Sequence, residues 1–233
     1  MTAKGLSRRD TQSRELMDEP DCDPDKLERT YRQFTTINRL VSGWRRIYCQ
    51  RLRPQLSGNR PTSLLDVGFG GGDIPRALAR WAARDGLSLQ ITAIDPDGRA
   101  IRHVRQLPDA GIRFEQASSA DLVARGDRFD VVISNHLLHH LDAPALGSLL
   151  DDSVALSRHL VVHNDLARGR AGYRLYAAAT LPLARGSFVH YDGLLSIRRS
   201  YRRHELRAQV PPQWSVEAMF PQRLLLTHER LVR

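Results

Sequence analysis

The chain has 233 residues, of which 41% are hydrophobic, and its 35 basic and 26 acidic residues give a net charge of +9. A chain of this length and hydrophobicity can bury a full core, which excludes global disorder. No apolar run approaches the roughly 18 residues of a membrane span, and the polar N-terminus lacks the apolar segment of a secretory signal. The two cysteines, Cys22 and Cys49, fit no metal-ligand spacing, so we expect no metal and a reducing, cytoplasmic setting.

The positive charge is the usual footprint of a nucleic-acid-binding protein. However, Lys4 and Lys26 are the only lysines, and the arginines are spread through the chain, many of them beside acidic residues. We attribute the charge to a general use of arginine in place of lysine and expect no nucleic-acid partner. One local basic cluster remains, formed by Arg198, Arg199, Arg202 and Arg203.

The N-terminal quarter of the chain predicts a tail and two helices. Residues 1–22 mix charges with few apolar side chains, which predicts a flexible tail. Asp23-Pro24 supplies an N-cap and a proline at the first helical position, so a helix is expected from there to Ser42-Gly43. A second helix is expected to reach about Arg53. We expect residues 23–61 to form a helical lid segment.

From Thr62 onward, short apolar runs alternate with helical stretches, which predicts parallel βαβ units and an α/β fold for residues 62–233. Strands are expected at 63–67, 89–94, 112–115, 129–134 and 160–163, with helices at 74–83, 99–106 and 145–156.

The end of the chain departs from this alternation. An insertion is expected at 167–193, with a helix over 171–183 and a loop through His190, Asp192 and Gly193. After a helix over 201–209, strands at 214–220 and 223–232 flank Pro221-Gln222 and predict an antiparallel pair at the sheet edge.

The strongest chemical signal is the sequence LLDVGFGGGD at residues 64–73, between a predicted strand and a predicted helix. Glycines at this edge of a parallel sheet let the backbone approach a ligand closely. A dinucleotide fingerprint would need its third glycine at Asp73, whose charge opposes a phosphate, and no lysine follows to make a P-loop. With Asp66 before the glycines, the loop suits a ligand that carries a positive charge.

Asp95 closes the second predicted strand. In this topology that position faces a ribose, where a carboxylate accepts two hydroxyl hydrogens. The glycine loop and Asp95 together predict a site for an adenosine without a phosphate chain.

The pattern DxGxGxG at residues 66–72, Asp95, and FDVVISNHLLHHL at 129–141 resemble the class I S-adenosylmethionine-dependent methyltransferases. INRLVSGWRR and LVVHNDLARGRAGYRLY resemble the small-molecule members of bacterial secondary-metabolite and quinone-like pathways. The resemblance covers about residues 24–233. It implies a Rossmann-like, seven-stranded, mostly parallel sheet with an antiparallel final strand, and S-adenosylmethionine as the cofactor.

The resemblance also implies which residues hold that cofactor. Asp66 would act around the methionine amino group, and Asp95 would bind the ribose hydroxyls. A serine stands where the family often has an acid for the adenine amino group, which either weakens that contact or moves it to Ser119 or Asp121. The remaining implied contacts are Gly68, Gly70 and Gly72 beneath the cofactor, Pro96 and Ser118 near the adenine, and Asn135 and His136 on the methionine side.

Methyl transfer requires an aligned acceptor, exclusion of water and, for a hydroxyl or acidic carbon, removal of a proton. His139 and His140 follow the fourth strand, and an imidazole that titrates near neutrality can accept such a proton. Alternatively, one of them packs against the sheet and the other caps a turn. Weaker candidates are His163, His190 and Asp165, and aromatic walls or core could come from Tyr31, Phe34, Trp44, Tyr173 and Tyr176.

These features predict methylation of oxygen or carbon in a small, aromatic or polyketide-type metabolite by an enzyme that is compatible with a homodimer. Methyltransferases of nucleic-acid amino groups commonly carry Asn or Asp, Pro-Pro and an aromatic residue after the fourth strand, where this chain has Ser134-Asn135-His136-Leu137. Two alternatives stay open: an RNA methyltransferase that uses the arginine cluster, and a non-catalytic binding protein with the same fold.

Overall fold

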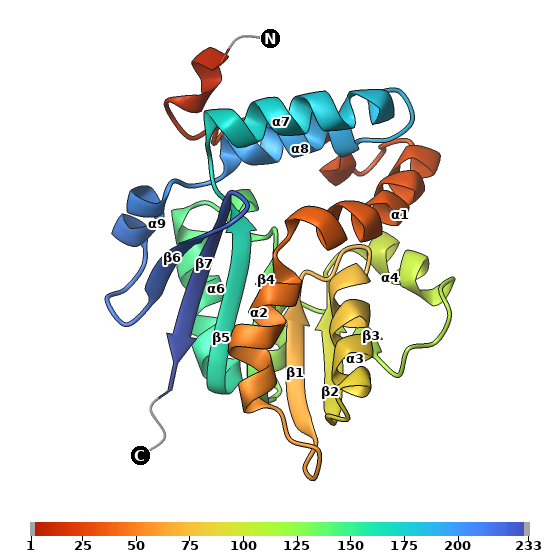
Figure 1. Cartoon of the computed structure of the whole chain (residues 1–233), viewed down its shortest axis with the longest axis vertical. Coiled ribbons are helices and arrows are strands. Elements are labelled where there is room, and N and C mark those ends of the chain that lie inside the picture. Colours follow the sequence, from red (N-terminus) through yellow and green to blue (C-terminus); the bar gives the residue numbers. More distant parts are fainter. Residues whose placement is uncertain (1–2, 231–233) are drawn as a thin grey trace.

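The computed structural model describes residues 3–230 and is built around one seven-stranded sheet of order β3-β2-β1-β4-β5-β7-β6 (Figure 1). Strand β7 runs antiparallel to both of its neighbours, and the other adjacent strands pair in parallel. The predicted α/β class and the antiparallel final strand are therefore confirmed. The strands are β1 (Thr62–Val67), β2 (Leu89–Ile94), β3 (Arg113–Glu115), β4 (Phe129–Asn135), β5 (Ser157–Leu166), β6 (Ser215–Met219) and β7 (Arg223–Glu229).

Helices connect successive strands, and further helices precede β1 and lie between β5 and β6. Asp23 caps the first of them as predicted, because its carboxylate accepts hydrogen bonds from the backbone N–H groups of Asp25 and Lys26. The α-helices are α1 (Pro24–Val41), α2 (Trp44–Ile47), α3 (Asp73–Arg84), α4 (Gly98–Arg105), α5 (Ser119–Ala124), α6 (Ala143–Leu156), α7 (Arg170–Thr180), α8 (Val189–Arg199) and α9 (Arg203–Gln209).

Two helices differ from the sequence prediction. The short helix α5 was not predicted, and the loop expected through His190, Asp192 and Gly193 is wrong, because these residues lie in α8. The polar residues and the glycine in this segment led to the prediction of a loop, although they belong to a helix that buries four apolar residues: Val189, Leu194, Leu195 and Ile197. Gly193 suits this helix for a packing reason, since a Cβ there would lie 2.1 Å from the hydroxyl oxygen of Tyr176.

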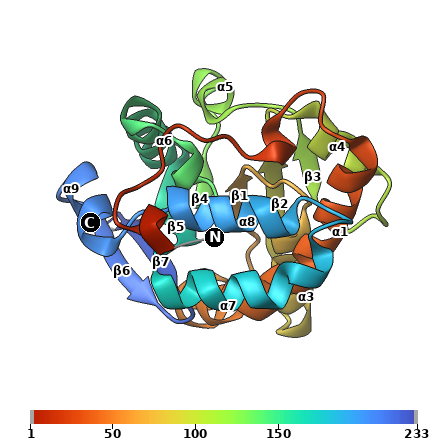
Figure 2. The same ribbon diagram turned by 90° about the horizontal axis from the view of Figure 1, so that it is seen from above.

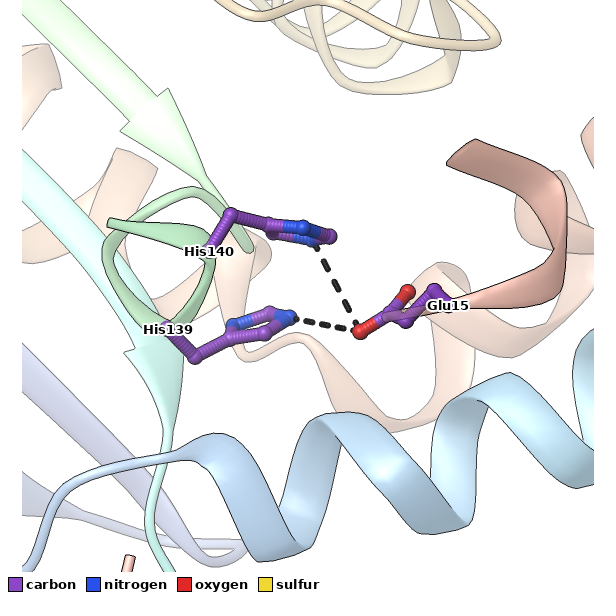
Figure 3. Close-up of side chains that lie close together, drawn as sticks. All are labelled: Glu15, His139 and His140. Carbon is purple, nitrogen blue, oxygen red and sulfur yellow. Dashed lines mark ion pairs between the residues drawn. The ribbon is translucent and has the colours of Figure 1, made fainter. Parts of the chain in front are cut away.

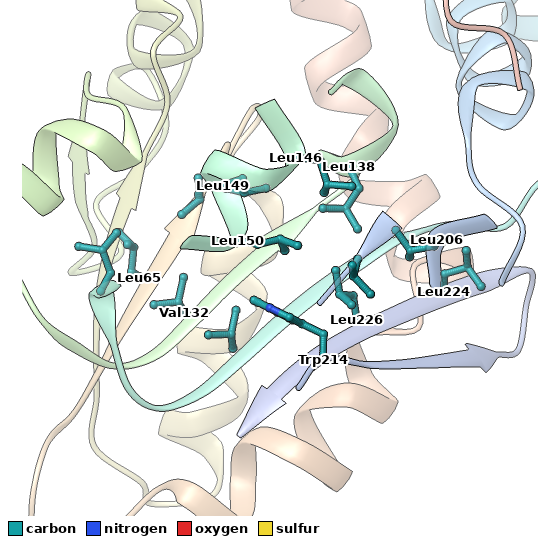
Figure 4. Packing of buried hydrophobic residues seen from close by; sticks show 14 of the residues in the cluster. Leu65, Val132, Leu138, Leu146, Leu149, Leu150, Leu206, Trp214, Leu224 and Leu226 are labelled. Atoms are coloured by element: carbon teal, nitrogen blue, oxygen red, sulfur yellow. The ribbon is translucent and has the colours of Figure 1, made fainter. Parts of the chain in front are cut away.

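The sheet has a hydrophobic core on each face because neighbouring residues of a strand point to opposite sides. Leu65 faces a cluster with Leu146, Leu150 and Trp214, which α6 and the C-terminal segments cover (Figure 4). Leu64 faces the opposite cluster, which contains residues of α2 and α3. Both faces are thus covered, and the edge at the carboxyl ends of the parallel strands is left for a ligand.

A helical layer lies over that edge. Helices α7 and α8 pack on each other and run across the carboxyl ends of the strands, with α1 beside them (Figures 1 and 2). Over residues 3–230, no helix is both long and apolar enough to cross a membrane.

The segment expected as a flexible tail instead packs against this layer. We call residues 5–22 the N-terminal strap; it runs past α8 to the start of α1 (Figure 2). Leu6 is 2% exposed and packs with residues of α7 and α8. The backbone N–H groups of Leu16 and Met17 donate to the carboxylate of Asp192 at 2.8 and 2.9 Å. Partners supplied by distant parts of the chain therefore hold a segment whose own composition is polar.

Candidate functional site

A cavity of about 360 Å³ lies between the carboxyl ends of β1, β2 and β4 and the helical layer. Its walls include the glycine loop, Pro96, residues of α1 and α8, and the N-terminal strap. Among the described residues that line it there is no lysine or arginine, although the chain is strongly basic. Its acidic residues are Glu15, Asp18, Asp66, Asp73, Asp95, Asp97 and Asp192.

The glycine loop lines the cavity through Gly68 and Gly70, but Gly72 has a different role. Gly70 has a φ of +52°, and a Cβ on it would meet nothing within 4 Å, so its backbone faces open space in the cavity. Gly72 has a φ of +70°, and a Cβ on it would lie 2.9 Å from Val104, so it permits close packing of the loop.

Asp66, the penultimate residue of β1, is a buried carboxylate at the cavity wall. The side chain is 1% exposed, and its Oδ1 atom has no hydrogen-bond partner in the described part of the chain. Burial raises its pKa well above the ordinary value, and the nearby charges of Asp73 and Asp95 add to the increase. A buried acceptor without a donor requires a partner, and a positively charged ligand would supply one.

Asp73 and Asp95 complete the acidic wall. Burial raises the pKa of Asp73 to about 6, although the side-chain amide of Asn38 donates a hydrogen bond to its Oδ2 atom at 3.0 Å. Burial also raises the pKa of Asp95, whose two oxygens accept backbone N–H bonds from Gly70 and Asp97 at 2.9 Å each. These bonds orient the Asp95 carboxylate and leave lone pairs for further donors.

The two serines expected near the adenine do not line the cavity. Ser118 caps α5 in a reciprocal pair with Asp121, and the Ser119 hydroxyl donates to Asp152 at 2.6 Å. The residues after the third strand therefore form the N-terminal cap of α5. The sequence prediction included neither this cap nor the helix. Asp121, the other expected adenine contact, is committed to the same cap.

Asn135 and His136 do reach the cavity, on the far side of the glycine loop. His136 has a φ of +58° and accepts a hydrogen bond on Nε2 from Arg223 at 2.5 Å. Arg223 is 1% exposed and also donates to the side-chain oxygens of Asn135 and Asn164 at 3.1 Å. Burial, together with the charge of Arg223, holds the pKa of His136 well below its ordinary value.

His139 lies between two carboxylates at the end of the cavity beside the N-terminal strap. It is 1% exposed; its Nδ1 atom is 2.7 Å from Asp165, and its Nε2 atom is 3.4 Å from Glu15 (Figure 3). Its backbone N–H also donates to Asp165 at 2.8 Å. Burial disfavours the imidazolium, but the charges of Asp165 and Glu15 outweigh this and raise the pKa of His139 to about 9.

His140 stands beside His139, with its ring centroid 4.3 Å away. Its Nε2 atom is 3.8 Å from the same Glu15 oxygen, and its Nδ1 atom is 3.2 Å from Asp18. Burial would raise the pKa of Glu15, but the two imidazoles hold it below its ordinary value. The predicted histidine pair is thus placed in the cavity, and the strap supplies the acids that face it.

The weaker candidates divide into two groups. Asp165 joins His139 directly, whereas His163 bonds the Ser134 hydroxyl inside the sheet and His190 bonds Thr180 within the helical layer. Among the aromatic residues, three line the cavity and two belong to the core. The first group is Tyr31, Phe34 and Tyr176; the second is Trp44 and Tyr173.

Three members of the arginine cluster donate to the protein's own backbone, and the fourth, Arg198, lies 3.9 Å from the carboxylate of Asp10. Arg199 donates to the carbonyl oxygens of His139 and His140 at 3.3 and 3.2 Å. Arg202 donates to Leu6, and Arg203 donates to Val216. These guanidinium groups tie together the strap, the histidine turn and the sheet edge, so the cluster is not a free phosphate-binding surface.

Comparisons with known proteins agree with this geometry. Residues 64–159 match the family model described as a methyltransferase domain. A ubiquinone biosynthesis O-methyltransferase of Azorhizobium caulinodans is 33% identical over 93 residues, which cover 39% of this chain and 33% of that protein. The counterpart from a Methylobacterium species is 32% identical over 82 residues, 34% of this chain and 30% of the relative. The chain therefore matches about a third of the length of these curated relatives.

Solved structures extend the similarity to almost the whole chain. The plantazolicin methyltransferase BpumL in complex with SAH superposes with a TM-score of 0.61, covers 91% of this chain and 90% of its own, and is 14% identical. Human N-acetylserotonin methyltransferase in complex with SAM gives a TM-score of 0.62 at 10% identity, over 90% of this chain and 57% of its own. At these identities the similarity establishes the fold. With its sheet order, its glycine loop and the sequence match over residues 64–159, the chain has the fold of the class I S-adenosylmethionine-dependent methyltransferases and contains a segment similar to their methyltransferase domain.

Proposed function

We propose that the protein transfers a methyl group from S-adenosylmethionine to an oxygen or carbon of a small, aromatic or polyketide-type metabolite. The acidic cavity is the observation that carries this proposal. Seven carboxylates and no lysine or arginine line it among the described residues, so it opposes phosphate-bearing ligands and attracts cationic ones. S-adenosylmethionine carries a sulfonium and an ammonium group, and it supplies an activated methyl group when bound.

The residues that line the cavity at the ends of β1 and β2 match the chemical groups of this cofactor. The unpartnered Oδ1 atom of Asp66 would accept from the ammonium group, which would relieve the cost of a buried acceptor. The oriented carboxylate of Asp95 would accept from the ribose hydroxyls. Gly70 leaves the space beneath the ligand that a side chain would fill.

The acceptor would occupy the other end of the cavity, under the helical layer. Tyr176 gives that end an aromatic side chain, which favours a flat apolar acceptor. Tyr31 and Phe34 line the cavity nearer the glycine loop and pack with Phe69. His139 and His140 would meet the acceptor atom, where proton removal is needed for a hydroxyl or an acidic carbon. The names of the relatives support a small acceptor, since they refer to ubiquinone biosynthesis, plantazolicin and N-acetylserotonin.

Calorimetry with S-adenosylmethionine tests the proposal, and the chain offers matched controls. Gly70→Val fills the cavity beneath the ligand, whereas Gly111→Val places the same side chain at another positive-φ glycine with open space, away from the cavity. Asp95→Ala removes the expected ribose acceptor. Asp109→Ala removes an exposed carboxylate that, like Asp95, accepts the backbone N–H two residues further on.

The wild-type protein and both controls are expected to bind the cofactor. Gly70→Val and Asp95→Ala are expected to lose about tenfold or more in affinity, because each removes or blocks a contact of about 1.5 kcal/mol or more. Failure of the wild-type protein to bind, or equal affinities in all five proteins, would exclude this cofactor site.

A further inference from the structure

Glu15, His139 and His140 converge on one point of the cavity wall. One side-chain donor atom from each residue lies within 4.8 Å of the other two. Figure 3 shows both imidazoles directing Nε2 toward the same Oε1 atom of Glu15, at 3.4 Å for His139 and 3.8 Å for His140. The three side chains come from two separate parts of the chain, the strap and the turn after β4.

The opposite side of each imidazole is held by a carboxylate. The Nδ1 atom of His139 is 2.7 Å from Asp165, and the Nδ1 atom of His140 is 3.2 Å from Asp18. A neutral imidazole that donates from Nδ1 presents a lone pair on Nε2. Carboxylates placed in this way orient and strengthen histidine ligands in metal sites.

One inner atom of the cluster lacks a hydrogen-bond partner, whereas Glu15 Oε1 also accepts a hydrogen bond from the Ser196 hydroxyl at 2.7 Å. His139 Nε2 is buried and forms no hydrogen bond within the described part of the chain. A metal ion bound here would replace the proton that the His139 ring otherwise carries between Nε2 and the Glu15 carboxylate. Ligand atoms about 2.0–2.1 Å from a tetrahedral zinc ion lie about 3.3 Å apart, close to the separation of Nε2 of His139 from Glu15.

We propose that Glu15, His139 and His140 bind a divalent transition-metal ion such as Zn²⁺, with Asp165 and Asp18 orienting the two histidines. Two imidazoles and one carboxylate are ligands that such ions accept. The surroundings favour a cation, because Asp18, Asp165 and Glu15 are close to it. The nearest guanidinium groups, Arg9 and Arg199, donate to backbone carbonyl oxygens of the histidine turn and not to the metal-facing atoms.

The three protein ligands leave a coordination position open to the cavity, which is the pattern of a catalytic rather than a structural site. This role rests on the proposed function. The ion would hold an oxygen of the acceptor and lower the pKa of its hydroxyl group, so that the proton passes to solvent water at neutral pH. The oxygen would then take the methyl group as the sulfonium–methyl bond breaks, and S-adenosylhomocysteine would be the leaving product. The acceptor class is then a hydroxylated metabolite, and the two imidazoles serve as metal ligands instead of accepting its proton.

Metal binding to untagged, chelator-treated full-length protein tests the site directly. Calorimetry with ZnCl₂ measures affinity and stoichiometry, and the visible spectrum of added Co²⁺ reports the coordination number. The ligand variants are Glu15→Gln and His140→Gln, and Asp18→Asn tests an outer carboxylate. His159→Ala is the matched control, because His159 Nε2 also lies 3.8 Å from a carboxylate, Asp130, but has no second histidine beside it.

We expect one ion per chain in the wild-type protein and in His159→Ala, with the Co²⁺ spectrum of a four- or five-coordinate site. Asp18→Asn should weaken binding by about tenfold, and each ligand variant by more than the roughly 10–100-fold typical of outer-shell losses. Thermal unfolding confirms that each variant is folded. Equal Zn²⁺ affinity in wild type, Glu15→Gln and His140→Gln, or no binding to the wild type, overturns the site. Cofactor calorimetry on the same samples separates this result from the proposed function, since S-adenosylmethionine binding without Zn²⁺ binding rejects only the metal.

Discussion

The two ends of the cavity are built in different ways. The end beside β1 and β2 consists of one strand, one glycine loop and the next strand end, and its acids Asp66, Asp73 and Asp95 lie within about thirty residues of sequence. The end beside the histidines combines the strap, the turn after β4, β5 and α8. We refer to them as the cofactor end and the acceptor end.

The cofactor end is therefore formed by residues close in sequence, and the acceptor end by contacts between residues far apart in sequence. The cofactor end is fixed by backbone geometry that a short motif specifies, and the Oδ1 atom of Asp66 has no hydrogen-bond partner among residues 3–230. The acceptor end is fixed by ion pairs and hydrogen bonds between distant segments, such as the bond from Ser196 to Glu15 at 2.7 Å. We therefore expect substitutions at the acceptor end to affect stability most, and substitutions at the cofactor end to affect ligand affinity most.

The largest expected effect is at the acceptor end. Asp165→Ala removes the carboxylate that accepts from the backbone and ring of His139, and it leaves both groups buried without that partner. The free energy of unfolding should fall by about 3–5 kcal/mol, as it does when one member of a buried charged pair is removed. Denaturant titration measures the loss, with Asp151→Ala on the exposed side of α6 as the control. A loss below about 1 kcal/mol would contradict the long-range construction of this end.

At the cofactor end, Asp66→Asn should separate affinity from stability. The affinity for S-adenosylmethionine should fall by about 10–100-fold, since a hydrogen bond to a charged group contributes about 1.5–3 kcal/mol. The free energy of unfolding should not fall, because burial already penalises the Asp66 carboxylate.

Asp130→Asn provides the contrast, since this buried carboxylate accepts from the backbone and hydroxyl of Ser63 at 2.8 and 2.9 Å. It should destabilise the fold and leave cofactor affinity unchanged. If Asp66→Asn instead destabilised the fold as strongly as Asp130→Asn, Asp66 would be a structural residue.

The smallest effect is a pH dependence of cofactor affinity that Asp73 contributes at the cofactor end. The pKa of Asp73 is raised to about 6, so this carboxylate takes up a proton as the pH falls from 7 to 5 and ceases to attract a cation. Cofactor affinity should fall by about tenfold over that range, as one pKa unit corresponds to 1.36 kcal/mol. Asp73→Asn should flatten the profile measured by calorimetry.

The same ionisation affects stability in the opposite direction. Because its folded pKa lies above the ordinary value of 3.8, Asp73 binds more protons in the folded than in the unfolded chain between about pH 4 and 6. Its contribution to stability therefore rises as the pH falls through this window. A cofactor affinity that is constant or higher at pH 5 would rule out Asp73 as an electrostatic contributor.

The contrast between the two ends also explains what could be predicted from the sequence. The apolar strands, the glycine loop, Asp66 and Asp95 were predictable because each depends on neighbouring residues in the chain. Glu15 and Asp18 were not, since a polar segment gives no local signal of a distant partner such as Asp192. For the same reason no metal site was expected, because the proposed ligand set joins residues with no recognisable spacing.

Ser118 and Ser119 show the reverse case, in which a local signal was present but assigned to another use. The sequence Ser118-Ser119-Ala120-Asp121 has the spacing of a reciprocal helix cap, and that is the role it takes. The position was interpreted instead through the resemblance to relatives that have an acid there. The structure after β3 decides between a helix cap and an adenine contact, because it shows whether these side chains face α5 or the cavity.

The packed strap has a practical consequence for recombinant work. A version of the protein that begins at Asp23 would keep the N-cap of α1, the sheet and the glycine loop. It would nevertheless lack Glu15 and Asp18, and with them the acids that face the histidines. Trimming the polar N-terminus to improve crystals or expression would thus remove part of the acceptor end, and an inactive product of that kind would say nothing about the acceptor offered to it.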